Sequence, residues 1–165
     1  MDDIQVDFEH LASSVAANLT NQHDWTHVIP HRAASDATQH PRALRPLLCG
    51  LPPRRLYIHP DEQVAVLQSG APSSGVNQDS EAEWVLPVHI KETLSLADFT
   101  AIFDSIETLP PLDVAGAAAS TALDTDGRDW RGSGRHKRIL LAVVHDDSTV
   151  SYYIMHDGIV KPRQN

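Results

Sequence analysis

The amino-acid sequence predicts an α+β domain, in which helices pack against a small mixed β-sheet. Apolar residues recur with a helical period near the N-terminus and again after Ser95, whereas two short runs rich in β-branched residues lie near the C-terminal end. A chain of 165 residues has room for one modest hydrophobic core but not for two. We therefore expect residues 1–165 to form a single domain.

The first predicted element is an amphipathic helix that extends roughly from Ile4 to Asn21. Apolar side chains recur there at spacings of three and four residues, which places them on one helix face: Phe8, Leu11, Val15 and Leu19. The following stretch, residues 29–60, is rich in proline and shows no clear period. Because proline lacks the backbone N–H that helices and ladders use, we expect this stretch to run extended across the domain surface.

Two segments of low complexity, residues 68–82 and residues 110–135, are predicted to be flexible. The first is rich in glycine, serine and proline, and the second in alanine, glycine, serine and aspartate. Such compositions bury too little apolar surface to offset the entropy of ordering the chain. Just before the first segment, Asp61–Leu67 is expected to form a short helix.

Between these segments the sequence predicts a strand followed by a helix. Trp84–Ile90 has the composition of a strand, but Pro87 interrupts it, which favours an edge strand or a bulge. Ser95 and Asp98 have the spacing of a capping box and predict where the helix begins. Two consecutive prolines end the helix, and its apolar stripe consists of Leu96, Phe99, Ile102, Phe103 and Ile106.

The last predicted element is a β-hairpin. Ile139–Val144 is an unbroken apolar run that is too short for a helix and suits a strand covered on both faces. His145–Ser148 has turn composition, and Thr149–Met155 is a second run of β-branched and aromatic residues. Since this hairpin is apolar on both faces, we expect it to lie inside a sheet or to pair with another chain.

Charge and its distribution narrow the classes of function. The net charge of −9 argues against a protein that binds nucleic acid over its whole surface. The basic residues are unevenly distributed, because between residues 56 and 127 the only cation is Lys91, against twelve acids. Segregated charge of this kind suits docking against a charged partner. It is equally compatible with a solvated surface that carries two basic linkers.

Several features argue against metal, disulfide and membrane chemistry. No apolar run approaches membrane-spanning length, so no membrane insertion is expected. The single cysteine, Cys49, has no partner for an internal disulfide and suits a reducing compartment. His23 and His27 have the spacing of zinc peptidases, but aspartate stands in place of the glutamate base and no motif positions a third ligand. We therefore expect neither a metal nor a cofactor.

The C-terminal hairpin also carries a family resemblance. Its sequence, AVVHDDSTVSYYIMHDGIVKP, resembles the corresponding hairpin of the tRNA-splicing endonuclease family. Two further blocks resemble the small structural subunit of that family, number fifteen in the fungal Sen series: EWVLPVHIKETLSLADFTAIFDSIE and HLASSVAANLTNQHDWTHVIPH. The resemblance covers most of the chain outside the two low-complexity segments. It implies a compact endonuclease-subunit domain related to restriction-endonuclease-like folds.

The resemblance further implies a division of labour among subunits. Related catalytic subunits cleave RNA by internal transesterification and supply the base, the acid and the cation from a tyrosine, a histidine and a lysine. Aligning the hairpin places Lys137 at the position of that lysine. The glycine-rich block that carries the other two has no counterpart here, and the context of Tyr57 and His59 does not match it. We therefore expect a non-catalytic structural subunit whose catalytic partners cut precursor tRNA at the intron splice sites.

The same resemblance assigns a partner interface to the hairpin. In related endonucleases an acidic loop at its turn enters a basic cleft on the opposite dimer and holds a heterotetramer together, which implies this role for His145, Asp146 and Asp147. The second strand joins the structural subunit to a catalytic subunit, which assigns its side chains to the interface: Val150, Tyr152, Tyr153, Ile154 and Met155. The plain alternatives are an exposed turn and burial within the chain's own domain.

A basic segment ahead of the hairpin is a candidate RNA contact. It contains Arg131, Arg135, Lys137 and Arg138, and a flexible cationic arm reaches phosphates with little pre-organisation. An ordinary basic linker is the alternative. Precursor tRNA would then be bound through the assembled complex.

Two other functions stay open on sequence alone. One is a self-contained RNase that uses Lys137 with His145 or His156, and the other is a generic homodimeric interaction module. Isolated chains would then form homodimers. For the proposed subunit, the family implies residence in the nucleus, with the cytosolic face of the mitochondrial outer membrane as the alternative in fungi.

Overall fold

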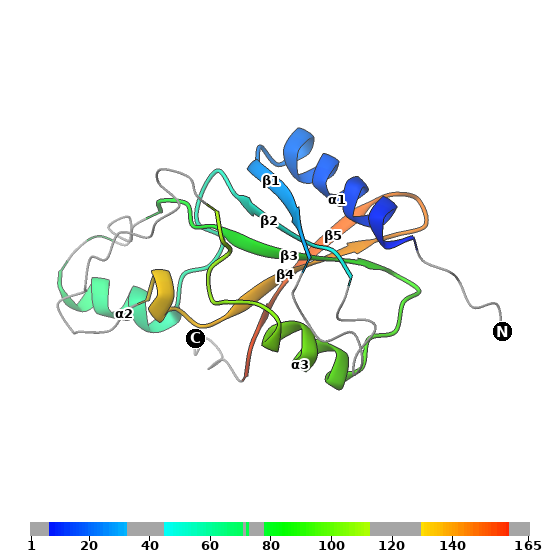
Figure 1. Cartoon of the computed structure of the whole chain (residues 1–165). Helices are drawn as coiled ribbons and strands as arrows, with labels where there is room; N and C mark the ends of the chain where they lie inside the picture. The colour runs from blue at the N-terminus through cyan, green and yellow to red at the C-terminus, as the bar shows by residue number, and fades with distance from the viewer. Residues whose placement is uncertain (1–6, 33–44, 71, 73–77, 113–129, 159–165) are drawn as a thin grey trace.

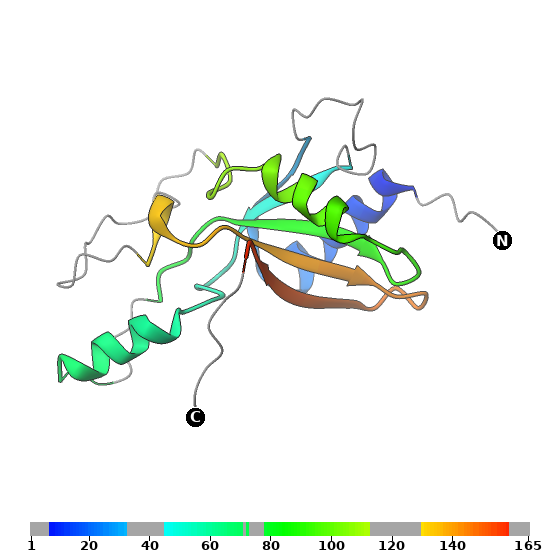
Figure 2. The same ribbon diagram turned by 90° about the horizontal axis from the view of Figure 1, so that it is seen from below.

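A computed structural model describes residues 7–32, 45–70, 72, 78–112 and 130–158. Figures 1 and 2 show a β-sheet with α1 and α3 on opposite faces, while α2 lies beyond one end of the sheet. The elements in chain order are α1 (Phe8–Gln22), β1 (Thr26–His31), β2 (Leu47–Leu51), α2 (Pro60–Gln68), β3 (Glu83–His89), α3 (Leu96–Asp104), the 3-10 turn η3 (Gly132–Gly134), β4 (Arg138–Val144) and β5 (Val150–His156).

The sheet has five strands in the order β1-β2-β3-β4-β5. All neighbours are antiparallel except β3 and β4, which are parallel and are joined by the segment that contains α3. Parallel neighbours need such a crossover, whereas the antiparallel strands β4 and β5 need only a tight turn. This architecture confirms the predicted α+β class, the mixed sheet and the C-terminal hairpin.

One face of the sheet is covered by α1. Asp7 caps this helix, since its side chain accepts hydrogen bonds from the backbone N–H groups of Glu9 and His10, both at 3.1 Å. The part of the predicted helix from Ile4 lies outside the described residues. Four residues of the helix are buried against the sheet: Leu11, Ala12, Val15 and Leu19. Their partners include Trp25, Leu48, Val85, Leu140, Ala142 and Val144.

The opposite face is covered by α3. Ser95 and Asp98 form the predicted capping box, because Ser95 Oγ accepts from the Asp98 N–H at 3.2 Å and the Asp98 carboxylate accepts from the Ser95 N–H at 2.8 Å. Trp84 lies fully buried beneath the helix, and its indole N–H donates to the backbone carbonyl of Glu107 at 2.9 Å. The remaining core on this face includes Leu47, Cys49, Leu86, Val88, Ile102, Phe103, Ile106 and Ile139.

The prediction that Pro87 marks an edge strand or a bulge is wrong. β3 is the central strand, and Pro87 pairs in register with Ala142 of β4. The ladder between β3 and β2 includes Val85 but stops short of Pro87, whose carbonyl instead accepts a hydrogen bond from the buried guanidinium of Arg45. The N–H and C=O of one strand residue point to the same side. The backbone N–H that Pro87 lacks would therefore point to the β2 side, where the ladder has already ended, so no ladder hydrogen bond is lost.

The proline-rich stretch is not an extended surface segment, because it contributes β2 and the end of β1 to the sheet. Residues 33–44 lie outside the described part. Leu47, Leu48 and Cys49 of β2 are 1%, 1% and 0% exposed. Burial raises the pKa of the Cys49 thiol to about 11. A five-residue strand flanked by prolines offers too short a pattern to stand out in sequence.

Parts of the two segments predicted to be flexible are packed. Residues 71, 73–77 and 113–129 lie outside the described part, but Glu81 and Ala82 are 0% and 1% exposed, and Arg135 is 5% exposed. An ionic cluster, rather than an apolar stripe, holds these residues in place. Hydrophobic patterning does not reveal an arrangement of this kind.

Candidate functional site

The terminal hairpin lies at one side of the sheet, with β5 as the edge strand. β4 and β5 pair without interruption along all seven residues of each strand. The turn closes through the His145 N–H, which donates to the Thr149 carbonyl at 2.8 Å. Ser148, with φ 68°, adopts the left-handed conformation at the tip. The outer edge of β5 has no strand partner within the described part of the chain.

The side chains of β5 divide between the core and the surface. Val150 and Tyr152 pack against the α1 side of the core, and the Tyr152 hydroxyl donates to a side chain of α1 at 2.6 Å. Met155 packs against the α3 side. Tyr153 and Ile154 face outward and are 57% and 37% exposed. Within this chain, three of the five predicted strand residues are therefore engaged with its own core, and two are available to another chain.

The carboxylates of the turn are exposed but held in place. The Lys91 ammonium lies 2.8 Å from one carboxylate oxygen of Asp146 and lowers its pKa, while His89 Nε2 lies 3.5 Å from the other. Asp147 accepts a hydrogen bond from the Thr149 N–H at 3.0 Å, which lowers the pKa of that carboxyl too. Both groups are therefore ionised at neutral pH, and both are exposed to solvent.

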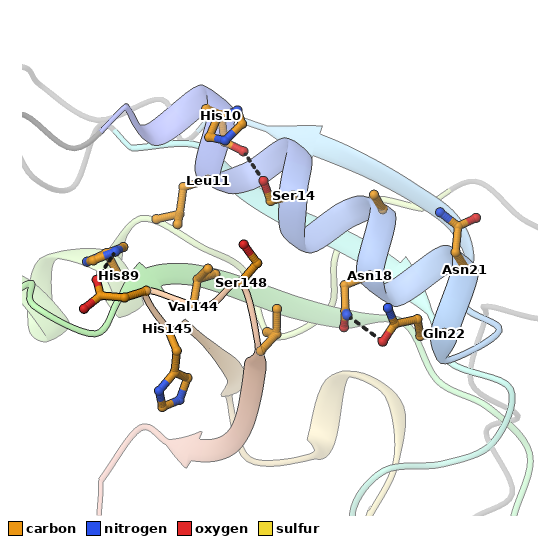
Figure 3. Close-up of a pocket in the computed structure, with 13 residues that line it drawn as sticks. His10, Leu11, Ser14, Asn18, Asn21, Gln22, His89, Val144, His145 and Ser148 are labelled. Atoms are coloured by element: carbon orange, nitrogen blue, oxygen red, sulfur yellow. Dashed lines mark hydrogen bonds and ion pairs between the residues drawn. The ribbon is translucent and has the colours of Figure 1, made fainter.

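A groove of about 470 Å³ lies between α1 and the hairpin turn (Figure 3). The α1 wall carries mainly polar side chains, and the other wall is formed by the ends of β3 and β4 and by the turn itself. His145, another predicted interface residue, lies 3.2 Å from Ser151 Oγ, measured from its Nε2 atom. The polar lining suits a hydrophilic segment of a partner: His10, Ser14, Asn18, Asn21 and Gln22 on one side, Asp146 and Ser148 on the other.

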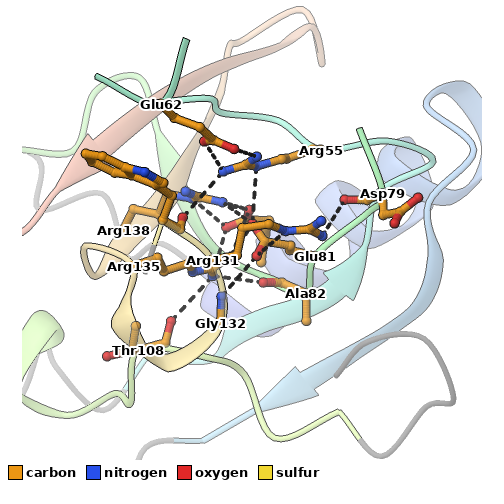
Figure 4. Close-up of polar contacts among 12 residues, drawn as sticks. Arg55, Glu62, Asp79, Glu81, Ala82, Thr108, Arg131, Gly132, Arg135 and Arg138 are labelled. Atoms are coloured by element: carbon orange, nitrogen blue, oxygen red, sulfur yellow. Dashed lines mark hydrogen bonds and ion pairs between the residues drawn. The ribbon is translucent and has the colours of Figure 1, made fainter. Parts of the chain in front are cut away.

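At the opposite end of the hairpin, three of the four predicted RNA-contacting residues enter a buried ionic cluster (Figure 4). Its centre is Glu81, whose side chain is 0% exposed and accepts a hydrogen bond from the Gly132 N–H at 3.1 Å. Guanidinium nitrogens lie 3.3–3.5 Å from its carboxylate oxygens, and they belong to Arg55, Arg131, Arg135 and Arg138.

Two further carboxylates complete the cluster. Glu83 pairs with Arg135 at 3.2 Å and with Arg138 through both of its oxygens. Glu62 of α2 forms a bidentate pair with Arg55, with both distances at 2.7 Å. Bidentate, charge-assisted contacts of this kind are strong and fix geometry. The cluster therefore joins α2, the segment before β3 and the segment before β4.

The charge state of Glu81 follows from two opposing effects. Burial raises its pKa, but the charge of Arg135, the Gly132 N–H and the other guanidinium groups outweigh burial and hold the pKa below its ordinary value. Glu81 is therefore ionised at neutral pH, as the arginines around it require.

This packing bears on the predicted RNA contacts. The side chains of Arg135 and Arg138 are 1% and 4% exposed and are occupied by carboxylates. Lys137 points to the α3 side of the sheet, where its ammonium donates to the Phe103 carbonyl at 2.9 Å. RNA contact by the basic segment stays a prediction, and the burial of Arg135 and Arg138 argues against these two side chains.

The residues named for a self-contained RNase do not converge. Lys137 and His145 flank the seven-residue strand β4 at opposite ends, more than about 20 Å apart at the rise of a strand. His156 lies opposite Arg138 in the hairpin register. Because successive strand residues alternate faces, His156 and Lys137 lie on opposite faces of the sheet.

The structure also assembles an aromatic pocket that sequence reasoning missed. His59 stacks on Trp130 with ring centroids 4.5 Å apart and planes at 27°, and it lies nearly parallel to His136 at 5.8 Å and 19°. Tyr57 and Arg138 also line this pocket, whose volume is about 230 Å³. The contributing segments are some seventy residues apart in the sequence, so only the folded chain brings them together.

The remaining motifs do not form sites. His23 follows the end of α1 and His27 lies in β1 with φ 53°, so the two imidazoles share no helix face. Among the described residues, no three histidine, cysteine, aspartate or glutamate side chains converge as metal ligands would. In the same part of the chain, no helix has the length and apolar character needed to cross a membrane.

Comparison with known proteins identifies the family of this chain. The model of the Sen15 protein family matches residues 14–165. The chain is 49% identical over 156 residues to the probable tRNA-splicing endonuclease subunit tsp-1 of Neurospora crassa, a match that covers 94% of this chain and 66% of that protein. It is 35% identical over 99 residues to the probable tRNA-splicing endonuclease subunit sen15 of Schizosaccharomyces pombe, covering 60% of each. The chain thus spans slightly less than two thirds of the length of these relatives.

Proposed function

The chain belongs to the Sen15 protein family, and from that premise we propose that it is a non-catalytic structural subunit of a heterotetrameric tRNA-splicing endonuclease. It pairs with a catalytic subunit through β5 and links the two halves of the assembly through the turn at Asp146 and Asp147. Catalytic residues lie on partner subunits, and precursor tRNA is bound through the complex. The names of both relatives support membership of such an assembly.

The observation that carries the pairing proposal is the outer edge of β5, along which the described residues place no further strand. An edge strand presents a row of backbone N–H and C=O groups that another strand can use. Beside this edge, Tyr153 and Ile154 are 57% and 37% exposed. Large apolar and aromatic side chains at such a position favour association, because burying them removes apolar surface from water.

The turn and the groove beside it support the second contact. Asp146 and Asp147 are ionised and exposed, so they can accept charge-assisted hydrogen bonds from arginine or lysine of another subunit. The groove between α1 and the turn adds a polar recess next to these carboxylates. A cationic, hydrophilic segment fits both features together.

The non-catalytic role is supported by the separation of the candidate catalytic groups. Lys137 donates to a backbone carbonyl beneath α3, and His145 and His156 lie at a distant end and on the opposite face of the sheet, respectively. A transesterification site needs its base, acid and cation around one phosphate.

Co-expression with candidate endonuclease subunits tests the proposal. The full chain should be recovered in a complex whose mass, measured by light scattering, corresponds to four subunits. Replacing Tyr153→Lys together with Ile154→Lys should reduce recovery of the catalytic partner at least tenfold, because two charges would be buried in the strand contact. Asp146→Lys with Asp147→Lys should instead leave the pair intact and halve the mass.

A matched control is available on α2. Val64 and Leu67 are 49% and 58% exposed, so Val64→Lys with Leu67→Lys introduces the same charge at similarly exposed apolar positions away from β5. This control should assemble like the unmodified chain. Recovery of no endonuclease subunits, or of a homodimer alone, would refute the proposed function in favour of a homodimeric module.

We further propose the nucleus as the cellular site of the complex, with the cytosolic face of the mitochondrial outer membrane as the alternative. Microscopy of the fluorescently tagged full chain, with markers for both compartments, distinguishes the two.

A further inference from the structure

The aromatic pocket beside the base of the hairpin is not explained by the fold or by the proposed interface. Its walls come from the segment after β2, which supplies Tyr57 and His59, and from the segment before β4, which supplies Trp130 and His136. The Tyr57 ring in turn contacts His156 edge-on, with centroids 4.6 Å apart. Four aromatic or imidazole side chains therefore converge on one recess at the surface.

The geometry of this recess suits a flat ring. His59, Trp130 and His136 are nearly parallel, with interplanar angles of 27° and 19° to His59. The His136 side chain is exposed, whereas those of His59 and Trp130 are half-buried, so the stack is open at the His136 side. A volume of about 230 Å³ lies below the range of roughly 300–1,000 Å³ that drug-sized ligands occupy, which favours a single ring system.

The charges around the recess favour a neutral ligand over a phosphate. The guanidinium groups of Arg135 and Arg138, which line it, already pair with Glu83. Burial lowers the pKa of the His59 imidazole, so this ring is neutral at neutral pH. Phosphate recognition would need unengaged positive charge, whereas stacking needs only ring faces.

We propose that this pocket holds one unpaired base of the precursor RNA, stacked on the exposed ring of His136, which His59 and Trp130 support from behind. Unpaired bases stack on tryptophan, tyrosine and histidine side chains in many RNA-binding proteins, with little dependence on sequence. The inference rests on the proposed function, since it assumes that the assembled endonuclease presents precursor tRNA to this chain. The pocket lies at the opposite end of β4 from the turn, so docking of the turn leaves it open.

The test uses the assembled endonuclease and precursor tRNA. His136→Ala should raise the Kd of the complex for precursor tRNA about tenfold, the size expected of one stacked base, and Trp130→Ala should act in the same direction. His136→Phe keeps a ring at the position and should bind like the unmodified complex. His27→Ala, at an exposed histidine of β1 that lines neither this pocket nor the groove beside the turn, is the matched control and should leave the Kd unchanged.

Two further measurements separate this inference from its alternatives. The mass of each variant complex is determined first, so that a failure to assemble counts against the proposed function and not against the pocket. Inorganic phosphate and adenosine are then compared as competitors. Competition by adenosine supports the pocket, whereas stronger competition by phosphate would mean an anion site. An intact His136→Ala complex with unchanged Kd would overturn the proposal.

Discussion

Charged side chains at the base of the β4–β5 hairpin are buried and paired, whereas those at its turn stand in solvent. At the base, the side chains of Glu81 and Arg135 are 0% and 1% exposed. At the turn, Asp146 and its partner Lys91 are 58% and 54% exposed. The two ends carry the same kinds of charged group, and the degree of burial decides whether these groups stabilise the fold or are available to a partner.

The difference separates a structural role from an available surface. Removing one member of a buried ion pair strands the other charge away from water, so the base is needed for folding. An exposed pair is screened by solvent and salt, so the turn contributes little to stability and is left for partners. The segregated charge of the sequence suggested docking against a partner, but much of it is satisfied inside the chain by Glu62, Glu81 and Glu83.

The largest effect is expected at the base. Glu81→Gln preserves the shape of the side chain but removes the charge that faces four arginines. We expect the free energy of unfolding to fall by about 3–5 kcal/mol, as when one partner of a buried ion pair is removed. Urea unfolding of the isolated chain, followed by circular dichroism, measures the change.

Glu107→Gln is the matched control for this substitution, because Glu107 is exposed and its side chain takes no part in the cluster. It should change the free energy of unfolding by no more than about 0.5 kcal/mol. If both substitutions changed the free energy of unfolding equally, the buried charge of Glu81 would be no more important for folding than an exposed one.

A smaller effect is expected from pH. Burial lowers the pKa of both His59 and His156, so the unfolded chain, with histidine pKa near 6.5, takes up protons first as the solution is acidified. Stability should therefore be fully present above about pH 7 and decline toward pH 5, before the carboxyl of Glu81 begins to protonate. Urea midpoints measured from pH 8 to pH 5 follow this decline.

His156→Phe sharpens the pH measurement, since it keeps a ring against Tyr57 but removes one titrating group. The decline between pH 7 and pH 5 should become shallower in this variant. A chain that gains stability on acidification over this range would contradict the assignment of neutral, buried imidazoles.

The smallest effect on stability is expected at the turn. Asp146→Asn with Asp147→Asn removes both charges while preserving the size of the side chains, and it should leave the urea midpoint unchanged. The same variant should lose the salt-sensitive part of its affinity for the opposite half of the endonuclease, measured by titration at two ionic strengths. A large loss of stability would place the turn with the base as a structural element.

Local patterns predicted much of the fold. The capping box of α3 at Ser95 and Asp98 and the two strands of the hairpin lie close to their predicted positions. The apolar stripe of α3 packs against the sheet as predicted except for Leu96, which is 83% exposed. These elements are determined by residues within a few positions of one another. The two carboxylates of the turn could also be named in advance, because turn composition and a family resemblance both include Asp146 and Asp147.

Contacts between distant residues were not predictable in this way. β2 is a core strand although prolines surround it, and Pro87 is central because the neighbouring ladder stops before it. The sequence predicts that Arg135 and Arg138 belong to a flexible basic arm. In the structure both are buried and pair with the carboxylates of Glu81 and Glu83, more than fifty residues away. The aromatic pocket likewise joins two separate segments.

The sequence by itself determined the helices, the terminal hairpin and the family, because periodicity, capping and turn composition are local and a long similarity is specific. Only the tertiary structure decided which charges are buried, which strands form the edges of the sheet and which rings share a pocket. The physical reason is that burial depends on what the rest of the chain places around a residue, and the energy of a charge or an aromatic ring depends on burial.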